Sequence, residues 1–323
     1  MADHAGDNFD DDIFIYRGGR APLHITHALI DKSIDEVEDN AFYDCEHLIH
    51  VETHDGIRRI GKQAFRLCKS LRRIDLKSVV EIDFSAFRIC KNLESVELGD
   101  RLVTIGNFVF YGCSSLTHLK LPSITTIGRC SFGQCKRLMD IEFSRRLEKM
   151  GTNAFWGCGR LQRIAIPMKR DLFAFDDVEQ TYNQFEGCER LVTVDLVGGI
   201  YKTVASLHMD RWRTEMTAEI SRINQVLPNT PADGKTGEIR RWMESVAVKM
   251  DHYKAEHYRY VKEGISLLEL ALWKTKLGEK EDSSEARETK KAKIDSESVR
   301  KERRITCGAE LVIKNVLPFL ELK

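Results

Sequence analysis

The 323-residue sequence lacks any hydrophobic run long enough to cross a membrane, because no stretch approaches the roughly 18 apolar residues that a spanning helix requires. It also lacks an apolar leader, since the first residues, MADHAGDNFDDDIFIYRGG, are acidic and polar. Neither sign of charge is in excess. The 50 lysines and arginines match the 50 aspartates and glutamates, so no overall charge attracts the chain to nucleic acid or to a membrane. We expect a soluble cytoplasmic protein.

Catalytic and cofactor motifs are equally scarce. No Ser-His-Asp set, paired-carboxylate cleft or HExxH motif can be placed in the sequence. Gly234, Lys235 and Thr236 resemble the end of a phosphate-binding loop, but Asn229 stands where that loop requires its first glycine. The stretch CEHLIHVETH would place its cysteine and histidines on different sides of the repeat described below, which disfavours a metal site. The sequence therefore predicts a non-enzymatic protein without a cofactor.

What the sequence does contain is an internal repeat. Seven segments share the frame I-G-x-x-A-F-x-x-C-x-x-L-x-x-I-x-L, at intervals of 22 or 23 residues and a last interval of 30. The cysteines of the frame are Cys45, Cys68, Cys90, Cys113, Cys135, Cys158 and Cys188. The phenylalanines three residues before them are Phe42, Phe65, Phe87, Phe110, Phe132, Phe155 and Phe185.

The frame predicts a solenoid. Its end, L-x-x-I-x-L, has the period-two alternation of a strand that is buried on one face. The segment A-F-x-x-C predicts a short helical turn, because residues three apart share a helix face, and the glycine before it suits a corner with unusual backbone angles. One repeat cannot bury its own apolar side, so the turns must stack. We predict an α/β leucine-rich-repeat solenoid of about seven to eight 22–23-residue turns, followed by an α-helical C-terminal region.

This frame resembles that of the BspA-type leucine-rich-repeat family over about residues 25–200. The later stretches SLHMDRWRTEM, LLELALWKTKL and CGAELVIKNVLPFL are similar to those of intracellular algal-type members. The resemblance implies a fold of stacked turns. It also implies a binding role, since the repeats of this family are reused in many binding proteins.

The regular cysteines raise the question of metal or redox chemistry. Equivalent residues of stacked turns form a nearly straight ladder, so four sulfurs would span about 14 Å, whereas zinc needs all four at about 2.3 Å. A disulfide between neighbouring turns is disfavoured by the parallel side-chain directions. No histidine recurs at a fixed offset that could activate a thiol. We predict that the cysteines are small core residues behind the phenylalanines.

The outward residues of the stacked strands are expected to form a continuous concave surface. One column on it is mostly acidic and reads Glu52, Asp75, Glu97, Lys120, Glu142, Ala165 and Asp195. A second column, two residues earlier in each strand, reads His50, Arg73, Ser95, His118, Asp140, Arg163 and Thr193. We predict that the acidic residues bind a basic or polar segment of a protein, and that the histidines and arginines set its register. The alternative is a simple solvated sheet face.

The opposite wall of the repeat is basic, with Arg66, Lys69, Arg88, Lys91, Lys136, Arg137, Arg160 and Arg190. A basic wall raises the alternative of a nucleic-acid partner. No aromatic stacking residues recur among its exposed positions, however, so we expect a protein partner rather than nucleic acid.

The last interval between repeats is longer because of an insertion near residues 167–181. It contains Leu172, Phe173 and Phe175. These residues form either a protruding anchor for a partner or a segment that folds back onto the flank of the solenoid.

After the repeats, the hydrophobic period becomes helical. One apolar stripe consists of Trp212, Met216, Ile220, Ile223 and Leu227. It predicts a helix that ends before Pro228 and caps the last turn. A second stripe, from Ile239 to Leu268, predicts a long helix to about Leu277. This helix either folds back on the first or pairs with a second copy of the chain, so the alternative function is a homodimer formed through it.

We therefore expect five segments along the chain. They are an acidic N-terminal segment (1–24), the solenoid (25–204), a helical cap with the long helix (205–278), a charged flexible linker (279–304) and an apolar docking tail (305–323). Lys290, Lys291 and Lys293 in the linker are either a nuclear-import signal or one patch of a solvated segment, which leaves a nuclear location open.

Overall fold

The computed structural model of the chain describes residues 13–169, 171–173, 183–197 and 209–284. The chain divides into two compact units. One consists of residues 1–199 and 215–247, and the other of residues 200–214 and 248–323. The first unit contains both β-sheets.

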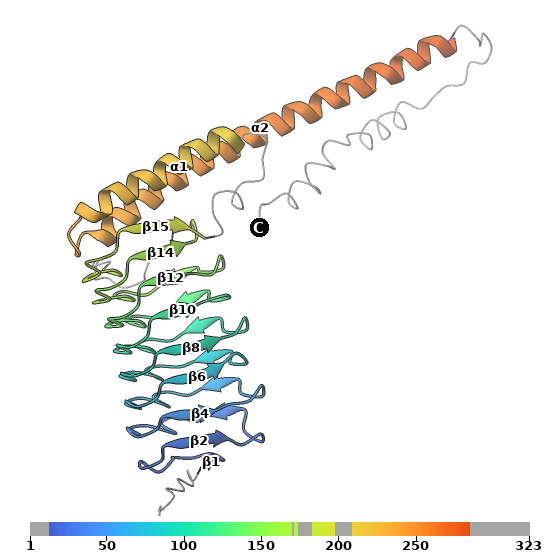
Figure 1. Ribbon diagram of the computed structural model, residues 1–323. Helices are drawn as coiled ribbons and strands as arrows, with labels where there is room; N and C mark the ends of the chain where they lie inside the picture. Colours follow the sequence, from blue (N-terminus) through green and yellow to red (C-terminus); the bar gives the residue numbers. More distant parts are fainter. Residues whose placement is uncertain (1–12, 170, 174–182, 198–208, 285–323) are drawn as a thin grey trace, which may run out of the picture. The chain divides into compact units, whose positions relative to one another are not determined.

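The first unit is a solenoid whose longer sheet has nine parallel strands (Figure 1). Each repeat contributes one strand, from its L-x-x-I-x-L segment, and this strand pairs with those of the neighbouring repeats. In order across the sheet the strands are β1 (Phe14–Tyr16), β2 (His27–Ile30), β4 (His50–Glu52), β6 (Arg73–Leu76), β8 (Ser95–Leu98), β10 (His118–Lys120), β12 (Asp140–Glu142), β14 (Arg163–Ile166) and β15 (Thr193–Leu196). The predicted solenoid of stacked parallel strands is confirmed.

The sequence pattern did not predict a second parallel sheet, to which repeats contribute the two residues immediately before the glycine position of the frame. Its six strands are β3 (Glu36–Val37), β5 (Arg59–Ile60), β7 (Glu81–Ile82), β9 (Thr104–Ile105), β11 (Thr126–Ile127) and β13 (Lys149–Met150). Each strand has only two residues, of which the second is buried. Two residues are too few to show an alternating pattern, which is why the sequence did not reveal this sheet.

The segment A-F-x-x-C does not form the helical turn that we predicted. In the repeat of Cys68, Gln63 and Leu67 have φ angles of 56° and 67°, in the left-handed region. The N–H groups of Gln63, Phe65 and Leu67 donate to carbonyl groups of the next repeat at 2.8–2.9 Å, and the intervening N–H groups donate within their own repeat. A helical turn would direct all its N–H groups along its own axis. The alternating direction instead bonds each repeat to the next.

The glycine before this segment allows close packing and does not supply the unusual backbone angle that we predicted. Gly128 and Gly151 are absent from the glycines with positive φ. A Cβ atom on Gly151 would lie only 2.4 Å from the backbone nitrogen of Arg129 in the preceding repeat. A Cβ atom on Gly128 would similarly lie 2.6 Å from the carbonyl carbon of Gly106. Successive repeats approach so closely here that only glycine fits.

The core is built on a stack of phenylalanine rings. Successive rings of the phenylalanine column have centroids 4.9–5.7 Å apart and planes within 16° of each other. Tyr16 extends this stack, because its ring lies 5.0 Å from that of Phe42 and its strand pairs with β2. Residues 13–24 therefore belong to the solenoid, and the predicted boundary after residue 24 is wrong.

The cysteine column lies in the same core, as predicted, and it also forms hydrogen bonds. The Sγ atom of Cys90 lies 3.0 Å from the carbonyl oxygen of Phe65, one repeat earlier, and that of Cys158 lies 3.1 Å from the carbonyl oxygen of Phe132. The same Phe65 oxygen accepts the N–H of Cys68 in its own repeat. Each thiol thus bonds to a buried carbonyl group and joins two repeats.

Two long helices follow the last repeat. They are α1 (Met209–Val226) and α2 (Lys235–Ser284), with the short 3-10 helix η2 (Leu227–Asn229) between them. Within the first unit, the side-chain oxygen of Asn224 accepts the N–H of Val194 in β15 at 2.8 Å. The hydroxyl of Thr236 accepts the N–H of Phe185 at 3.0 Å. These bonds satisfy backbone groups of the last repeat. We predicted this capping role for the first helix, and the start of α2 shares it.

Lys235, at the start of α2, completes this cap. Its side chain is 1% exposed, and its Nζ atom donates to the carbonyl oxygens of Glu189 at 2.8 Å and Leu191 at 2.6 Å. Burial lowers the pKa of Lys235, although Cys188 and Glu189 oppose this effect. The Gly-Lys-Thr sequence that resembled the end of a phosphate-binding loop is therefore used inside the fold.

Helix α2 is longer than predicted at both ends. It begins at Lys235 and reaches Ser284, so residues 279–284 are helical and do not belong to a flexible linker. The glutamates and lysines there are good helix formers. In the second unit, the ring of Trp212 packs edge-on against Tyr253 at 5.2 Å. The rest of the predicted linker and the predicted tail, residues 305–323, lie outside the described residues. None of the described helices is long and apolar enough to cross a membrane.

Candidate functional site

The outward residues of the nine-stranded sheet form the surface predicted to bind a partner, which we term the strand face. The backbone register places Arg73 opposite His50 and Asp75 opposite Glu97. The two predicted columns are therefore true columns, with neighbouring residues about 4.8 Å apart across the strands. The predicted residues that lie in these strands are Glu52, Asp75, Glu97, Glu142, Asp195, His50, Arg73, His118 and Arg163.

Lys77 neutralises the middle of the acidic column. It follows β6, and its Nζ atom forms ion pairs with Asp75, at 3.3 Å, and with Glu97 on the next strand. Hydrogen bonds with Glu97 and Asp75 raise the pKa of Lys77. A single cation is thus held between the carboxylates of two adjacent strands.

Arg163 has the same role near the C-terminal end of the sheet. Its guanidinium forms ion pairs with Asp140 on β12, at 3.1 Å, and with Asp195 on β15, at 2.8 Å. The sequence predicted Arg163 and Asp195 as ligands for a partner, yet the structure pairs them with each other. Their neighbour Ala165 is only 1% exposed. This end of the column is therefore largely satisfied within the chain.

Glu52 and Glu142 differ from the other acidic residues of the column. Both are exposed, and neither forms an ion pair within the described part of the chain. Glu142 has Lys120 as its backbone partner on β10. Glu52 and Glu142 are thus the residues of the acidic column that form no ion pair within the described part of the chain.

The predicted histidines contribute less. His50 is exposed, and its ring lies 6.4 Å from the ring of His27 on the neighbouring strand. His118 lies in β10 opposite Asp140, and its side chain is outside the described part of the structure. Arg73 is exposed next to His50. The prediction that these residues set the register of a partner stays a prediction.

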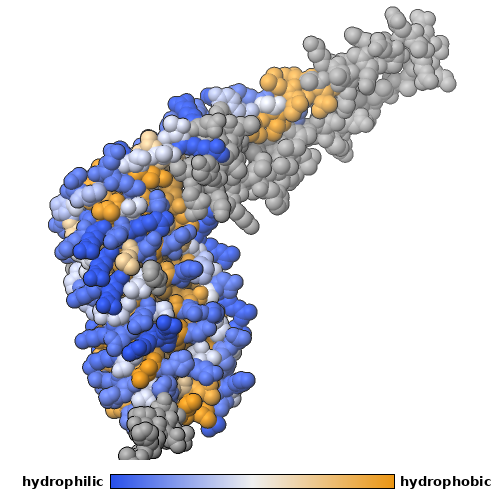
Figure 2. All heavy atoms as spheres, in the orientation of Figure 1, coloured by the Kyte–Doolittle hydropathy of each residue, from blue (hydrophilic) through white to orange (hydrophobic). Residues whose placement is uncertain are grey.

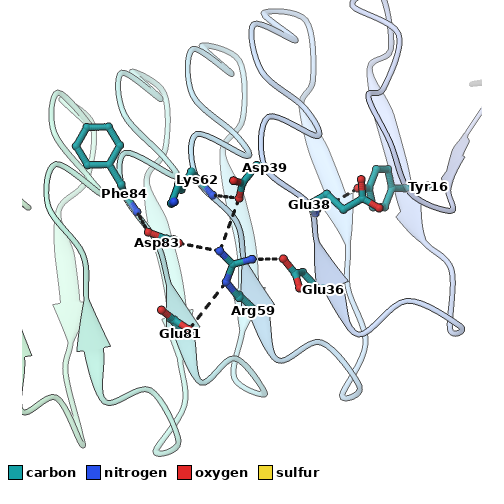
Figure 3. Close-up of polar contacts among 9 residues, drawn as sticks. All are labelled: Tyr16, Glu36, Glu38, Asp39, Arg59, Lys62, Glu81, Asp83 and Phe84. Carbon is teal, nitrogen blue, oxygen red and sulfur yellow. Dashed lines mark hydrogen bonds and ion pairs between the residues drawn. The ribbon is translucent and has the colours of Figure 1, made fainter.

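The strongest cluster of ion pairs lies on the shorter sheet, which the sequence pattern did not predict (Figure 3). Arg59 on β5 is surrounded by carboxylates from the repeats before and after its own. Its guanidinium pairs with Glu36 on β3, lies 2.7 Å from Asp83 and 3.7 Å from Asp39, and is 3.9 Å from Glu81 on β7. Burial raises the pKa of Asp83, but hydrogen bonds from the Phe84 N–H and from Arg59 outweigh it and lower the pKa overall.

A simple signal could have revealed this cluster. Glu36, Arg59 and Glu81 occupy the same position, immediately before the buried residue of each short strand, and the register pairs them directly. Alternating charges at one repeat position therefore predict an ion-pair ladder. Because every carboxylate of the cluster faces the one arginine, the cluster locks three repeats together and does not offer a free binding site.

Aromatic rings lie along the basic wall, but among those described only Phe84 is exposed, so the prediction that no stacking residue recurs at its exposed positions stays a prediction. Phe84 is 37% exposed and packs edge-on against Phe108, whose ring contacts Tyr111. Tyr111 in turn stacks with Trp156 at 6.4 Å. Tyr111 and Trp156 share one position of the frame, directly after the phenylalanine, whereas Phe84 and Phe108 stand at two other positions.

Of the two alternatives for the insertion, the described residues follow the second, in which the segment folds back onto the solenoid. Leu172 is fully buried, and Phe173 is 4% exposed with its ring edge-on to that of Phe185 at 6.2 Å. Both side chains extend the core because the phenylalanine stack offers them an apolar surface. Phe175 lies outside the described residues.

The thiols of the core are poor nucleophiles. Burial raises the pKa of the Cys45 thiol to about 11, and it raises the pKa values of Cys68, Cys90 and Cys158 as well. A thiolate is the reactive form, so these cysteines are inert at neutral pH. Among the residues that the structure describes, no group of histidine, cysteine, aspartate and glutamate side chains could hold a metal ion.

Solved structures of similar fold are leucine-rich-repeat proteins of bacteria. A leucine-rich repeat protein from Bacteroides ovatus is 23% identical, with a TM-score of 0.42, over 54% of this chain and 49% of that protein. The leucine-rich repeat protein of T. pallidum is 24% identical, with a TM-score of 0.37, over 60% of this chain and 82% of that protein. A leucine rich cell surface protein from Faecalibacterium prausnitzii is 22% identical, with a TM-score of 0.25, over 54% of this chain and 68% of that protein. The chain thus spans about half the length of the Bacteroides protein.

Among curated proteins, no significant match was found. The model of the BspA type leucine rich repeat region matches in 6 copies, over residues 22–123, 76–175 and 103–204. Together these stretches cover more than half of the chain and coincide with the stacked repeats of the structure. The chain belongs to the BspA-type leucine-rich-repeat family.

Proposed function

We propose that the chain is a non-enzymatic interaction scaffold, and that its strand face binds a protein or peptide with a basic or polar segment. The repeat family supports a scaffold for protein interactions in general. The acidic column supports the finer proposal, because Asp75 and Glu97 stand side by side on adjacent strands and Glu142 follows in the same column beyond Lys120. A bound segment would therefore meet a row of carboxylates and not a single charge.

Lys77 is the observation that carries this proposal. Its ammonium group lies between the carboxylates of Asp75 and Glu97, which stand on adjacent strands. The spacing of the strands is therefore suited to a cation that bridges two of them. A lysine or arginine of a partner would occupy the equivalent place beside Glu52 or Glu142, the glutamates without such a cation.

The experiment is affinity capture with the full chain and with a double charge reversal, Glu52→Lys and Glu142→Lys. Both side chains are exposed and form no described ion pair, so we expect the variant to fold with an unchanged unfolding midpoint. Partners retained by the native chain should be lost, since each contact with a cation becomes repulsive.

The matched control is Asp55→Lys with Asp100→Lys, which reverses the same number of charges on exposed loop residues outside the strands. This variant should retain the partners. Equal loss with both variants would show a dependence on net charge alone and would contradict a role of the strand face. Retention of every partner by the strand-face variant would contradict it as well.

A second candidate function is homodimerisation through α2. Figure 2 shows hydrophobic side chains gathered near the end of the coloured part of this helix. Leu267, Leu268, Leu270 and Trp273 are 55–68% exposed. Successive positions point about 100° apart around a helix, so these side chains cover several sides of α2. A helix that is apolar on several sides is normally covered by other helices.

Light scattering tests this second function. A homodimer would double the monomer mass of 37.1 kDa. The variant Leu267→Glu with Leu270→Glu should then be monomeric, while the exposed Val226→Glu in α1 should leave the mass unchanged. A native chain that is monomeric at all concentrations would contradict dimerisation and leave the strand face as the proposed site.

A further inference from the structure

On the wall opposite the strand face, the charged residues are mostly basic, whereas those of the acidic column are mostly acidic. We define the turn wall as the two residues after the glycine position, after the phenylalanine and after the cysteine of each repeat. In the repeats of Cys68 to Cys158, every charged residue at these positions is basic. They are Lys62, Arg66, Lys69, Arg88, Lys91, Arg129, Lys136, Arg137 and Arg160. Acidic residues stand there only in the first and last repeats.

Aromatic rings hold the central arginines of the turn wall in place. The guanidinium carbon of Arg88 lies 5.4 Å from the ring centre of Phe108 and 5.2 Å from that of Tyr111. The guanidinium of Arg66 similarly lies 5.6 Å from the ring centre of Tyr43. These are cation–π distances, and the rings restrict the motion of both cations. The arginines are therefore positioned before any partner arrives.

The charges of these arginines are not offset by carboxylates. The Arg88 side chain forms no ion pair or hydrogen bond within the described part of the chain, and its buried Nε atom has no acceptor. Arg66 donates to Gln63 at 2.8 Å, but its Nε atom is also buried without an acceptor. Arg59 and Arg163, by contrast, are each shared between carboxylates. The Nε atoms are buried and out of reach of a partner, so an anion would bind at the terminal guanidinium nitrogens, which have no carboxylate partner within the described part of the chain.

The same rings are poorly placed to stack on nucleic-acid bases. Tyr111 contacts the Arg88 guanidinium and stacks with Trp156 at an interplanar angle of 13°. This contact spans two repeats because Gly133 stands between them, where a Cβ atom would lie 2.8 Å from the Tyr111 ring. The rings are already used in holding cations and one another. Single-stranded nucleic acid needs free ring faces, so the wall suits anionic side chains better than bases.

We propose that the turn wall is a second interaction surface and that it binds an acidic segment of a partner protein. Arg66 and Arg88 occupy the same position in adjacent repeats and act as the rigid centre, where carboxylates find unpaired guanidinium groups. Lys91, Lys136 and Arg160 are exposed around this centre and attract the segment over a longer distance. The strand face binds cations and the turn wall binds anions, so the scaffold can hold two partners of opposite charge.

Fluorescence anisotropy with the full chain tests this inference. The probes are a labelled peptide of alternating glutamate and serine and a labelled oligodeoxythymidine of the same net charge. We expect the peptide to bind more tightly than the oligonucleotide. The double variant Arg66→Gln and Arg88→Gln should weaken peptide binding about tenfold or more. Arg88→Lys should give an intermediate loss, because it keeps the charge but loses the planar group that stacks on the rings.

The matched control is Arg145→Gln with Arg146→Gln, which removes the same charge from an exposed corner outside the turn wall. It should change the affinity less than about twofold. Unfolding midpoints of all variants show whether they are folded, and Arg88→Lys serves if the double variant is not. Equal weakening by the control, tighter binding of the oligonucleotide, or no peptide binding at low salt would each overturn the proposal.

Discussion

The strand face and the turn wall are two surfaces of the same repeats, yet they treat their charges in opposite ways. On the strand face, Lys77 and Arg163 are each held between carboxylates of neighbouring strands. On the turn wall, Arg66 and Arg88 rest on aromatic rings and have no carboxylate partner within the described structure. The first surface is partly neutralised within the chain, and the second retains the positive charge of Arg66 and Arg88, although Lys69 pairs with Glu46.

This difference arises because the shared core restricts only the buried positions of each repeat and not the outward ones. The phenylalanine, cysteine and leucine columns are buried at the same positions in every repeat, so they specify stacking and nothing else. The outward positions carry no such requirement. On the strand face they stand side by side and pair across strands, whereas on the turn wall large rings reach cations in neighbouring repeats. One core therefore supports two chemically different surfaces.

The largest expected loss of stability comes from a change in the core that supports both surfaces. Phe110→Ala removes one ring from the stack and leaves a cavity between Phe87 and Phe132. We expect a loss of about 3–5 kcal/mol in the free energy of unfolding, measured by urea titration. Phe84→Ala, on the turn wall and 37% exposed, should cost less than about 1.5 kcal/mol. Similar losses for the two would show that the stack does not carry the stability.

The next effect concerns the cap at the last repeat, where both surfaces end. Lys235→Met removes two hydrogen bonds from a buried ammonium group to the carbonyls of Glu189 and Leu191. We expect a loss of about 1.5–3 kcal/mol at neutral pH. Lys254→Met, in the exposed part of α2, should be neutral. A neutral effect at both positions would contradict a capping role of Lys235.

The same variant has an expected pH dependence. Burial lowers the folded-state pKa of Lys235 below its ordinary value of 10.5. In the alkaline range between the folded and unfolded pKa values, the unfolded chain binds more protons, so stability rises with pH there. The difference between the native chain and Lys235→Met should therefore grow as the pH approaches 10.5, and unfolding titrations at neutral and alkaline pH measure it.

A smaller effect should disturb the turn-wall side of the solenoid. Gly151→Ala places a Cβ atom 2.4 Å from the backbone of the preceding repeat, so the repeats must separate locally. We expect a loss of about 1–3 kcal/mol, from urea titration. Gly159→Ala is the control, because nothing lies within 4 Å of its Cβ position. It should be neutral or slightly stabilising, and a loss equal to that of Gly151→Ala would contradict the close-packing argument.

The smallest effect compares the two ways of holding a cation. Lys77→Gln removes exposed ion pairs and should lower the stability only slightly, and this small loss should vanish in high salt. Arg88→Gln removes a half-buried cation from two rings, with a loss of about 0.5–1 kcal/mol that persists in high salt. Urea titrations at low and high salt measure both losses. An equal salt dependence of the two losses would contradict the proposal that the two surfaces hold their cations in different ways.

Much of the solenoid could be predicted because its signal is repeated. Residues such as Phe65, Cys68 and Leu71 recur at one spacing, and a stacked arrangement is the only way to bury them all. The columns of the strand face followed from the same register. The left-handed residues, such as Gln63 and Leu67, could not be predicted, because side chains other than glycine rarely adopt that conformation.

The candidate sites were predictable only in part. The sequence placed Asp75 and Glu97 on one face correctly, but it could not show that Lys77 reaches both. Nor could it show that Arg88 lies between Phe108 and Tyr111, which belong to the next repeat and to two different positions of the frame. Such contacts depend on where side-chain ends meet, and the ends of long side chains are free to choose among rotamers.

The sequence by itself determined the repeat length, the identity of the buried columns and the sorting of acidic and basic residues to different walls. These follow from periodicity, which relates each residue to the backbone. The tertiary structure alone decided which charges form ion pairs and which stay available to a partner. It also showed that Lys235, which resembles part of a phosphate-binding loop, instead donates hydrogen bonds to the carbonyl groups of the last repeat. Pairing depends on distances between repeats, and these exist only after the turns have stacked.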